Sequence, residues 1–343
     1  MKRGLLIGLC LMLLIGMIGC SDSSINDKFY NEADPIRVVD GAGRNVSFPE
    51  PVKTVATTWG GTIDPYLFAL GVQDRLVATN ATNEFHQMLV PDMVSMKSIG
   101  RWALDKEALA SVSPELYVHG LGGLEHLKTA NKLGVRGVVL SMNTFDDVKN
   151  NLTMLGKVFG VEERAEKENA YCDGILDLID SRVSRLPEEK KVTVVVLGEE
   201  VGYVASDIYN TMEEMIRFAG GKSVVPEDIT TKTDYTDVGL ETIFKWNPDF
   251  MFLQSNWGEM TDEQILADPA WANLTSVQNG HVYALPSVVD SWGTATPSCY
   301  LGALFMSMQM YPELYQDVDY EQIVLDFYQN VYGLETTRDQ MGF

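Results

Sequence analysis

The residues of this sequence that could do chemistry stand mostly just after predicted strands. His119-Gly120-Leu121-Gly122-Gly123 follows a short run of strand-forming residues, and a glycine-rich turn at a strand end can hold a phosphate or build an oxyanion hole. A dinucleotide-binding fingerprint would need a glycine where Glu125 stands, and the chain has no G-x-S-x-G nucleophile elbow. The string therefore predicts a tight loop at the mouth of a cleft and no catalytic residue.

Histidine could serve as a metal ligand, and the chain has four: His86, His119, His126 and His281. They show neither an H-E-x-x-H motif nor another paired spacing, so no metal site is predicted. His119 and His86 follow predicted strands, and the ligands of open α/β sheets collect outside the carboxyl ends of strands. Either histidine could contact a ligand or its metal; the alternative is a hydrogen-bonded structural histidine.

Large aromatic residues recur at the same kind of position and predict a wide apolar cleft for a flat or bulky ligand. Any one of them could instead be a core residue. Arg101 adds a cation that could bind anionic oxygens in a bidentate way, unless it pairs with the nearby Asp105. The predicted ligand-binding residues are Trp59, Phe85, Arg101, Trp102, His119, Tyr203, Tyr235, Trp257 and Trp292.

The elements that must position these residues alternate between strands and helices, which predicts α/β lobes with parallel, doubly wound sheets. One helical pattern without breakers runs from about Glu162 to Leu186 and is expected to join two such lobes, with the ligand cleft between them. In an earlier helix, Asp64 is expected to be the cap, Pro65 the first residue and Gly71 the stop. The predicted strands are 36–40 and 45–48, which form a hairpin, then 52–58, 75–79, 116–119, 136–140, 192–198, 202–205, 249–254 and 281–285, followed by a helical tail over 297–332.

The N-terminus predicts export. Lys2 and Arg3 precede a short apolar run over 5–18, and Met17-Ile18-Gly19-Cys20 resembles a lipobox, whose cysteine is acylated and becomes the mature N-terminus. Acyl chains on Cys20 would anchor the protein to the outside of the cell membrane through a polar tether, and simple secretion is the alternative. The expected divisions are 1–19 signal peptide, 20–35 lipidated tether, 36–160 N-terminal lobe, 161–187 connecting helix and 188–343 C-terminal lobe.

The net charge and the cysteine content limit which ligands and which covalent cross-links are expected. Without Lys2 and Arg3 the chain holds 24 basic residues against 48 acidic ones, and such an acidic protein is not expected to bind nucleic acid. Apart from Cys10 and Cys20 near the N-terminus, only Cys172 and Cys299 remain. Two cysteines on helical patterns are expected to be buried free thiols, with a single disulfide as the alternative.

A set of segments carries a combined signal through its order and spacing: Val38 to Val46, Leu70 to Val77, Glu107 to Leu116, Glu241 to Asp249, Gln278 to Pro286 and Trp292 to Leu314. Together they resemble the class III substrate-binding proteins for ferric siderophores, haem and cobalamin. The resemblance implies two lobes, a rigid connecting helix and a cleft that closes modestly. It also implies that Glu107 and Glu241, one per lobe, dock on arginines of a permease. Trp102, His119, Tyr235 and Trp292 fall at or beside cleft-lining positions of cobalamin-binding relatives, although most differ in residue type.

The sequence therefore predicts a monomeric, extracytoplasmic, lipid-anchored binding protein that captures a ferric siderophore and delivers it to an ABC permease and its ATPase. Haem or a corrinoid is the alternative ligand if His119 or His86 reaches the metal axially. No intrinsic cofactor is expected. An extracytoplasmic enzyme is a remote alternative, because the motifs supply no positioned nucleophile or acid–base pair.

Overall fold

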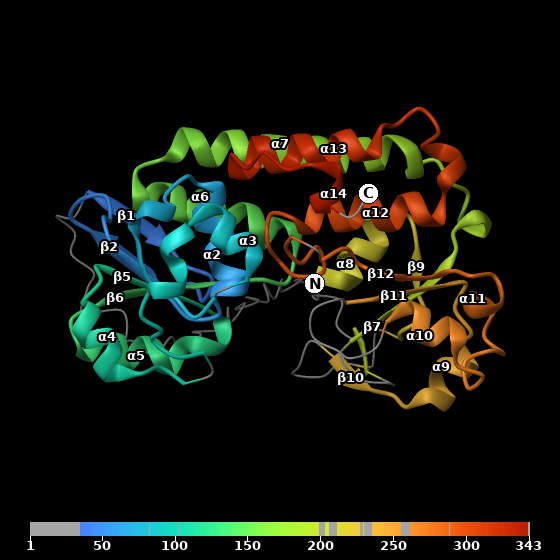
Figure 1. Cartoon of the computed structure of the whole chain (residues 1–343), viewed down its shortest axis with the longest axis horizontal. Helices are drawn as coiled ribbons and strands as arrows, with labels where there is room; N and C mark the ends of the chain where they lie inside the picture. The colour runs from blue at the N-terminus through green and yellow to red at the C-terminus, as the bar shows by residue number, and fades with distance from the viewer. Residues whose placement is uncertain are drawn as a thin grey trace, which may run out of the picture.

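The computed structural model describes residues 35–81, 83–101, 103–198, 203–205, 211–226, 229, 235–254, 261–287 and 289–341. These residues form two α/β lobes side by side, with a long helix running along one edge of both (Figure 1). The predicted fold class is confirmed. In the part of the chain that is described, no helix combines the length and the apolar character needed to cross a membrane.

The first lobe is built on a four-stranded parallel sheet in the order β4-β3-β5-β6. Its strands are β3 (Val55–Thr57), β4 (Leu76–Ala78), β5 (Leu116–Gly120) and β6 (Arg136–Leu140). The antiparallel hairpin β1 (Ile36–Val39) and β2 (Asn45–Phe48) precedes it, as predicted. The helices are α2 (Gly60–Ala69), α3 (Glu84–Leu89), α4 (Lys106–Val112), α5 (Leu124–Lys132) and α6 (Phe145–Phe159), with short turns η1 (Gln73–Arg75), η2 (Pro91–Ser95) and η3 (Leu121–Gly123).

Both faces of this sheet are buried, which explains why its strands are continuous apolar runs. Along β5, Leu116 and Val118 belong to the core beneath α2 and α6, whereas Tyr117 points to the opposite core beneath α4 and α5. His119 lies on the same face as Tyr117, since side chains alternate along a strand. This alternation places His119 beside the start of α5.

The second lobe has a mixed sheet, which differs from the purely parallel sheet expected. Strands β7 (Thr193–Leu197), β9 (Lys222–Ser223), β11 (Phe250–Leu253) and β12 (Val282–Ala284) are parallel, whereas β8 (Tyr203–Ala205) and β10 (Tyr235–Asp237) pair antiparallel at one edge. A short return from β7 to β8 allows antiparallel pairing, because a parallel pair would need a longer crossover. The helices of this lobe are α8 (Thr211–Phe218), α9 (Leu240–Trp246), α10 (Asp262–Ala267), α11 (Thr275–Gln278) and α12 (Cys299–Met310).

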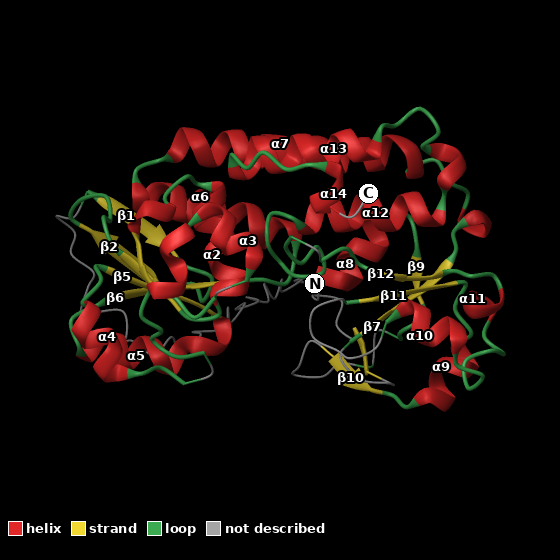
Figure 2. Cartoon of the chain, viewed as in Figure 1, coloured by secondary structure: helices red, strands yellow, loops and turns green. Residues whose placement is uncertain are grey.

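Helix α7 (Glu162–Val183) runs along both lobes (Figure 2). Its buried residues Cys172, Ile175 and Ile179 recur at helical spacing and face the core. The chain later returns alongside α7, where Tyr171 packs against Phe327 with ring centroids 6.1 Å apart. The short turn η4 (Glu188–Lys190) follows α7 directly, and the elements of the C-terminal return are η5 (Pro312–Leu314), α13 (Tyr320–Phe327), the π-helical turn η6 (Tyr328–Tyr332) and α14 (Arg338–Met341).

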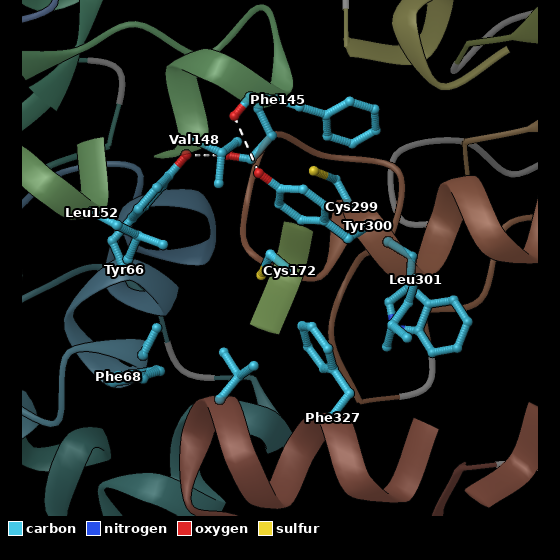
Figure 3. Packing of buried hydrophobic residues seen from close by; sticks show 14 of the residues in the cluster. Tyr66, Phe68, Phe145, Val148, Leu152, Cys172, Cys299, Tyr300, Leu301 and Phe327 are labelled. Atoms are coloured by element: carbon cyan, nitrogen blue, oxygen red, sulfur yellow. Dashed lines mark hydrogen bonds between the residues drawn. The ribbon is translucent and has the colours of Figure 1, made fainter. Parts of the chain in front are cut away.

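One apolar core continues from lobe to lobe (Figure 3). The ring of Phe145 on α6 lies 4.8 Å from the ring of Tyr300 on α12, and the Tyr300 hydroxyl donates to the carbonyl of Phe145 at 3.2 Å. The hydroxyl of Tyr66 donates to the carbonyl of Ala295 at 2.6 Å. Separating the lobes would break these contacts, so large relative motion is disfavoured.

The start of α2 is a correction to the sequence prediction. The helix begins at Gly60 instead of Pro65, and the carbonyl of Trp59 accepts from the backbone N–H groups of Thr62 and Ile63. Asp64 does not cap the helix, because its fully buried carboxylate accepts hydrogen bonds from side chains of neighbouring strands. Tertiary hydrogen bonds to Thr57 and Thr79 therefore decide the role of Asp64, which local capping rules would place at the start of a helix.

Candidate ligand-binding site

Four ring-bearing side chains meet at the carboxyl end of the first sheet, and we call them the Trp59 cluster: Trp59, Tyr117, His119 and His126. The ring of His119 lies 5.0 Å from Trp59 and 4.9 Å from His126, centroid to centroid. Tyr117 lies 6.2 Å from His119. Trp59 lies between β3 and α2, Tyr117 and His119 come from β5, and His126 comes from α5.

Gly120 and Met142 complete the packing around Trp59. A Cβ atom added to Gly120 would lie 2.6 Å from Met142 Cε and 3.6 Å from Trp59 Cζ3. The missing side chain therefore leaves the space that the indole and the methionine occupy. This requirement explains a glycine at the end of β5.

Trp59 has an unusual backbone conformation, with φ 58° and ψ 40° in the left-handed region. A bulky residue there costs roughly 1–3 kcal/mol, so the surrounding structure has to hold it. Its side chain remains partly exposed, unlike most large aromatic residues of the lobe. The next residue, Gly60, is fixed by a hydrogen bond from its N–H to Asn80 Oδ1 at 3.0 Å.

His119 is held as a neutral imidazole with one nitrogen available. Its Nδ1 lies 2.9 Å from the carbonyl of Gly120, so this nitrogen is the protonated donor. Burial lowers the pKa of His119 below its usual value, the Gly120 carbonyl opposes that shift, and His126 adds to it. Nε2 is buried and has no hydrogen-bond partner among the described residues. A lone pair on Nε2 can accept a proton donor or bind a metal.

The Trp59 cluster does not form a closed metal site by itself. Within the described ranges, no group of three histidine, cysteine or acidic side chains could hold a metal ion. A metal at His119 would therefore have to bring most of its ligands with it, as a chelate does.

A buried polar group lies beneath the Trp59 turn. Asp64 accepts from Thr57 Oγ1 at 2.6 Å and from Thr79 Oγ1 at 2.7 Å, and His86 Nε2 lies 3.5 Å from its carboxylate. Burial by itself disfavours a charge on either group: it raises the pKa of Asp64, against the two hydroxyl hydrogen bonds, and lowers the pKa of His86, against its contact with the Gly60 carbonyl. His86 is fully buried with both ring nitrogens in contact with protein oxygens. The hypothesis that His86 reaches a ligand's metal is therefore wrong.

The second lobe meets the first close to this cluster. Thr211, at the start of α8, donates to the carbonyl of Met142 at 3.2 Å. Glu214, one turn further, accepts a hydrogen bond from the backbone N–H of Phe145. Burial raises the pKa of Glu214, and the Phe145 N–H opposes that shift. Met142 therefore lies beside Gly120 and Trp59 through its side chain and contacts the second lobe through its backbone carbonyl.

Two predicted ligand-binding residues are core residues, which corrects their assignment. Phe85 is completely buried and packs edge-on against Tyr332, with centroids 5.0 Å apart. Trp292 is 2% exposed, and its indole N–H donates to the hydroxyl of Tyr328 at 3.0 Å. Both follow strands in the sequence, but the returning C-terminal helices cover them.

The remaining predicted positions divide into exposed and undescribed residues. Arg101 is exposed. Glu107 and Glu241 are exposed in the first turns of α4 and α9, which are corresponding places in the two lobes. Cys172 and Cys299 are buried and free, as predicted. Cys20, Trp102 and Trp257 lie outside the described residues, as do the side chains of Tyr203 and Tyr235.

Sequence reasoning missed Met142, Thr211 and the Asp64–His86 contact. Met142 and Thr211 belong to loop-to-helix junctions of different lobes and carry no motif. A buried role for Asp64 could have been considered, because an acidic residue followed by proline in an apolar helical pattern is either a helix cap or a buried carboxylate that accepts hydrogen bonds. Only the fold shows that Thr57 and Thr79 converge on it.

Two cavities lie away from the Trp59 cluster. One of about 630 Å³ is bordered by Phe68, Met88, Arg164 and Tyr332. The other, of about 560 Å³, separates the β1–β2 hairpin from α6. Neither contains a residue predicted to bind ligand, and Arg164 already donates to the carbonyls of Ala69 and Val331.

Comparison with known families matches residues 55–289 to the family described as periplasmic binding protein. The chain belongs to this family. It is 22% identical to molybdate-binding protein MolA of Haemophilus influenzae over 344 residues, covering 92% of this chain and 95% of the relative. It is 23% identical to Fe(3+)-citrate-binding protein YfmC of Bacillus subtilis, covering 84% and 90%.

Solved structures share the fold of this periplasmic binding protein. Helicobacter pylori CeuE with Ni(II) bound superposes with a TM-score of 0.75 at 22% identity, covering 90% of this chain and 98% of the other. The predicted resemblance to class III binding proteins is confirmed, and the chain is an extracytoplasmic substrate-binding protein of an ABC importer that works with a permease. It belongs among solute-binding proteins and not among enzymes.

Proposed function

We propose that this binding protein captures a ferric siderophore beside the Trp59 cluster and delivers it to its permease. The observation that carries the proposal is the partly exposed indole of Trp59 at the carboxyl end of the first sheet, where its ring centroid lies 5.0 Å from that of His119. Relatives support the ligand class, since they include proteins named for Fe(3+)-citrate, petrobactin and iron(3+)-hydroxamate binding.

The residues of the proposed site supply complementary chemistry. The indole of Trp59 offers an apolar face for the organic framework of a chelate. Arg101, exposed on the same lobe, would bind anionic oxygens around the iron, for which a guanidinium is suited. The chain's net charge of −22 disfavours highly anionic ligands. A neutral or weakly charged ferric hydroxamate therefore fits better than molybdate or ferric citrate.

Haem or a corrinoid is the second candidate, and one observation favours it. The unpartnered Nε2 of His119 is a suitable axial ligand for a macrocycle metal. His119 is only 2% exposed, so axial binding would require the side chains around it to move. A ferric chelate needs no such movement if it contacts Trp59 alone.

Other parts of the proposal concern the protein's attachment and docking. Acylated Cys20 would hold the protein at the membrane, and Glu107 and Glu241 would contact the permease, one from each lobe. The divisions 36–160, 161–187 and 188–343 remain our prediction for the lobes and their connecting helix.

Tryptophan fluorescence tests the ligand class. The protein lacking residues 1–19 would be titrated with ferric desferrioxamine B, a ferric catecholate, ferric citrate, molybdate, haemin and cobalamin. We expect saturable quenching by the ferric hydroxamate, with most of the signal lost in Trp59→Phe. Trp246→Phe is the matched control, because Trp246 is also partly exposed but packs in the separate core of the second lobe.

The outcomes separate the candidates. Quenching by haemin or cobalamin, abolished in His119→Ala, would favour the macrocycle. Quenching by molybdate alone would overturn the iron-chelate proposal. Equal loss of signal in both tryptophan variants would remove the Trp59 cluster as the binding site.

A further inference from the structure

A single buried carboxylate joins the ends of two neighbouring strands beneath Trp59. Asp64, with no exposed surface, accepts from Thr57 at the end of β3 and from Thr79 just after β4. Thr79 Oγ1 also accepts the backbone N–H of Ala81 at 3.2 Å. Each carboxylate oxygen therefore already receives a hydrogen bond from a hydroxyl group, which favours the ionised form of the acid.

His86 contacts the same group from α3. Its Nε2 lies 3.1 Å from the carbonyl of Gly60, and its Nδ1 contacts Asn83 Oδ1. The Asn83 atom that faces the ring is the amide oxygen and not the amide nitrogen, because the same atom accepts the backbone N–H of His86 at 3.0 Å and caps the helix. Both ring nitrogens thus face oxygen acceptors.

Only one protonation state satisfies both contacts. A neutral imidazole has one N–H, so one nitrogen lone pair would face an oxygen lone pair. An imidazolium donates from both nitrogens, and the Asp64 carboxylate 3.5 Å from Nε2 balances its charge. Burial opposes a charge on either group alone, whereas the contact favours charge on both.

The surroundings contain no competing charge among the described contacts of this pair. Asp64 and His86 are otherwise contacted by Thr57, Thr79, Asn83 and the rings of Phe68 and Phe85. All of these are neutral. The apolar rings also exclude water, which strengthens the attraction between the two charges.

We infer that Asp64 and His86 form a buried carboxylate–imidazolium pair that positions the Trp59–Gly60 turn. His86 contacts the carbonyl of Gly60, and Asp64 accepts hydrogen bonds from the end of β3 and from the segment after β4. The pair therefore connects these three segments. Space there is tight, since a Cβ atom on Gly60 would lie 2.1 Å from Thr79 Oγ1 and 2.7 Å from Asp64 Oδ2. Asp64 and His86 are positioning residues, and their effect on ligand affinity rests on the proposed function of Trp59.

The charge state is tested without any ligand. Long-range ¹H–¹⁵N spectra of the histidine rings would be recorded at about pH 7.5, where an unperturbed histidine is mostly neutral. We expect His86, assigned by its disappearance in His86→Gln, to show both nitrogens protonated. In Asp64→Asn the same ring should become neutral. A neutral His86 in the wild-type protein would overturn the pair.

The positioning role is tested by Trp59 emission and by affinity for ferric desferrioxamine B. Asp64→Asn and His86→Gln should each shift the Trp59 emission and weaken binding at least about tenfold, while lowering Tm by on the order of 10 °C. The double variant should lose less than the sum of the two, because neither charge is then left unpaired.

Asp249→Asn is the matched control. Asp249 Oδ2 accepts from the N–H and the hydroxyl of Thr193 at 2.8 and 2.7 Å, but it lies in the second lobe without a histidine on its carboxylate. This variant should lower Tm and leave Trp59 emission and affinity unchanged. Unchanged emission in Asp64→Asn would overturn the positioning role. A wild-type protein that binds none of the ligands would overturn the proposed function alone, since the NMR result does not depend on it.

Discussion

Trp59 and Trp292 look alike in the sequence but have different environments in the fold. Each follows a strand, and each lies near a buried aspartate, Asp64 in the first lobe and Asp290 in the second. Trp59 is partly exposed at a left-handed helix cap, whereas Trp292 is 2% exposed. What differs is the covering layer, because the returning C-terminal helices supply the Tyr328 hydroxyl that accepts from Trp292.

The two aspartates differ in the same way. Asp64 has a histidine beside its carboxylate, whereas Asp290 accepts from two neutral hydroxyls, those of Ser298 and Tyr328. Burial raises the pKa of Asp290 to about 6, against the hydroxyl hydrogen bonds. The C-terminal network joins buried residues of the core, whereas the Asp64 network lies beneath the binding site that we propose.

The sharpest test compares alanine at the two tryptophans. Trp292→Ala should lower the free energy of unfolding by about 3–5 kcal/mol, because it leaves a large cavity and an unpaired Tyr328. Trp59→Ala should cost about 1 kcal/mol or less, yet remove ligand quenching. Urea denaturation monitored by circular dichroism measures both. Equal losses would show that Trp59 is as much a core residue as Trp292.

The pH dependence of stability should report buried carboxyl groups, of which Asp290 and Glu213 lie in the second lobe. The folded-state pKa values of Asp290 and Glu213 are raised by burial to about 6 and about 7, so the folded protein retains protons that the unfolded chain releases. The free energy of unfolding should therefore fall as pH rises from about 4 to about 7, by roughly 2 kcal/mol or more. Asp290→Asn should flatten the lower part of this fall. An unchanged slope in that variant would contradict the assignment.

Tyr328→Phe should have a moderate effect. It removes the donor to Asp290 and the acceptor of the Trp292 N–H, so we expect a loss of about 1–3 kcal/mol. Tyr66→Phe is the comparison from the first lobe, because it deletes the hydrogen bond that Tyr66 donates to the carbonyl of Ala295 and the longer one that it accepts from Asn151 Nδ2 at 3.4 Å, and should cost about 1 kcal/mol. Both changes are read from urea midpoints at constant m-value. A larger loss in Tyr66→Phe would reverse the order of the two regions.

A small change in stability is also expected for Gly120→Ala. The new methyl would meet the flexible end of Met142 at 2.6 Å and approach the Trp59 ring, so the side chains should shift at a cost of roughly 1 kcal/mol. The Trp59 emission should move. Gly122→Ala is the control, because a Cβ atom there meets nothing within 4 Å. Identical spectra for the two variants would remove Gly120 from the packing around Trp59.

Local patterns predicted most strands and the long helix well. β6 was predicted over its exact range of 136–140, and α7 begins at the expected Glu162 but ends at Val183, three residues early. Apolar runs and helical spacing depend on neighbouring residues, so they are visible in the chain. The antiparallel pair β8 and β10 was not predicted, because pairing direction depends on where a distant strand returns.

The sequence by itself determined the α/β class, the two lobes, the connecting helix and the family. These follow from periodicity and from the order of short motifs, which are properties of chain segments. The tertiary structure alone decided which aromatic residues are exposed, since Phe85 and Trp292 are covered by residues more than 30 positions away. It also decided that Asp64 pairs with His86 instead of capping a helix. Burial and ionisation depend on what packs against a side chain, and the sequence does not state its neighbours in space.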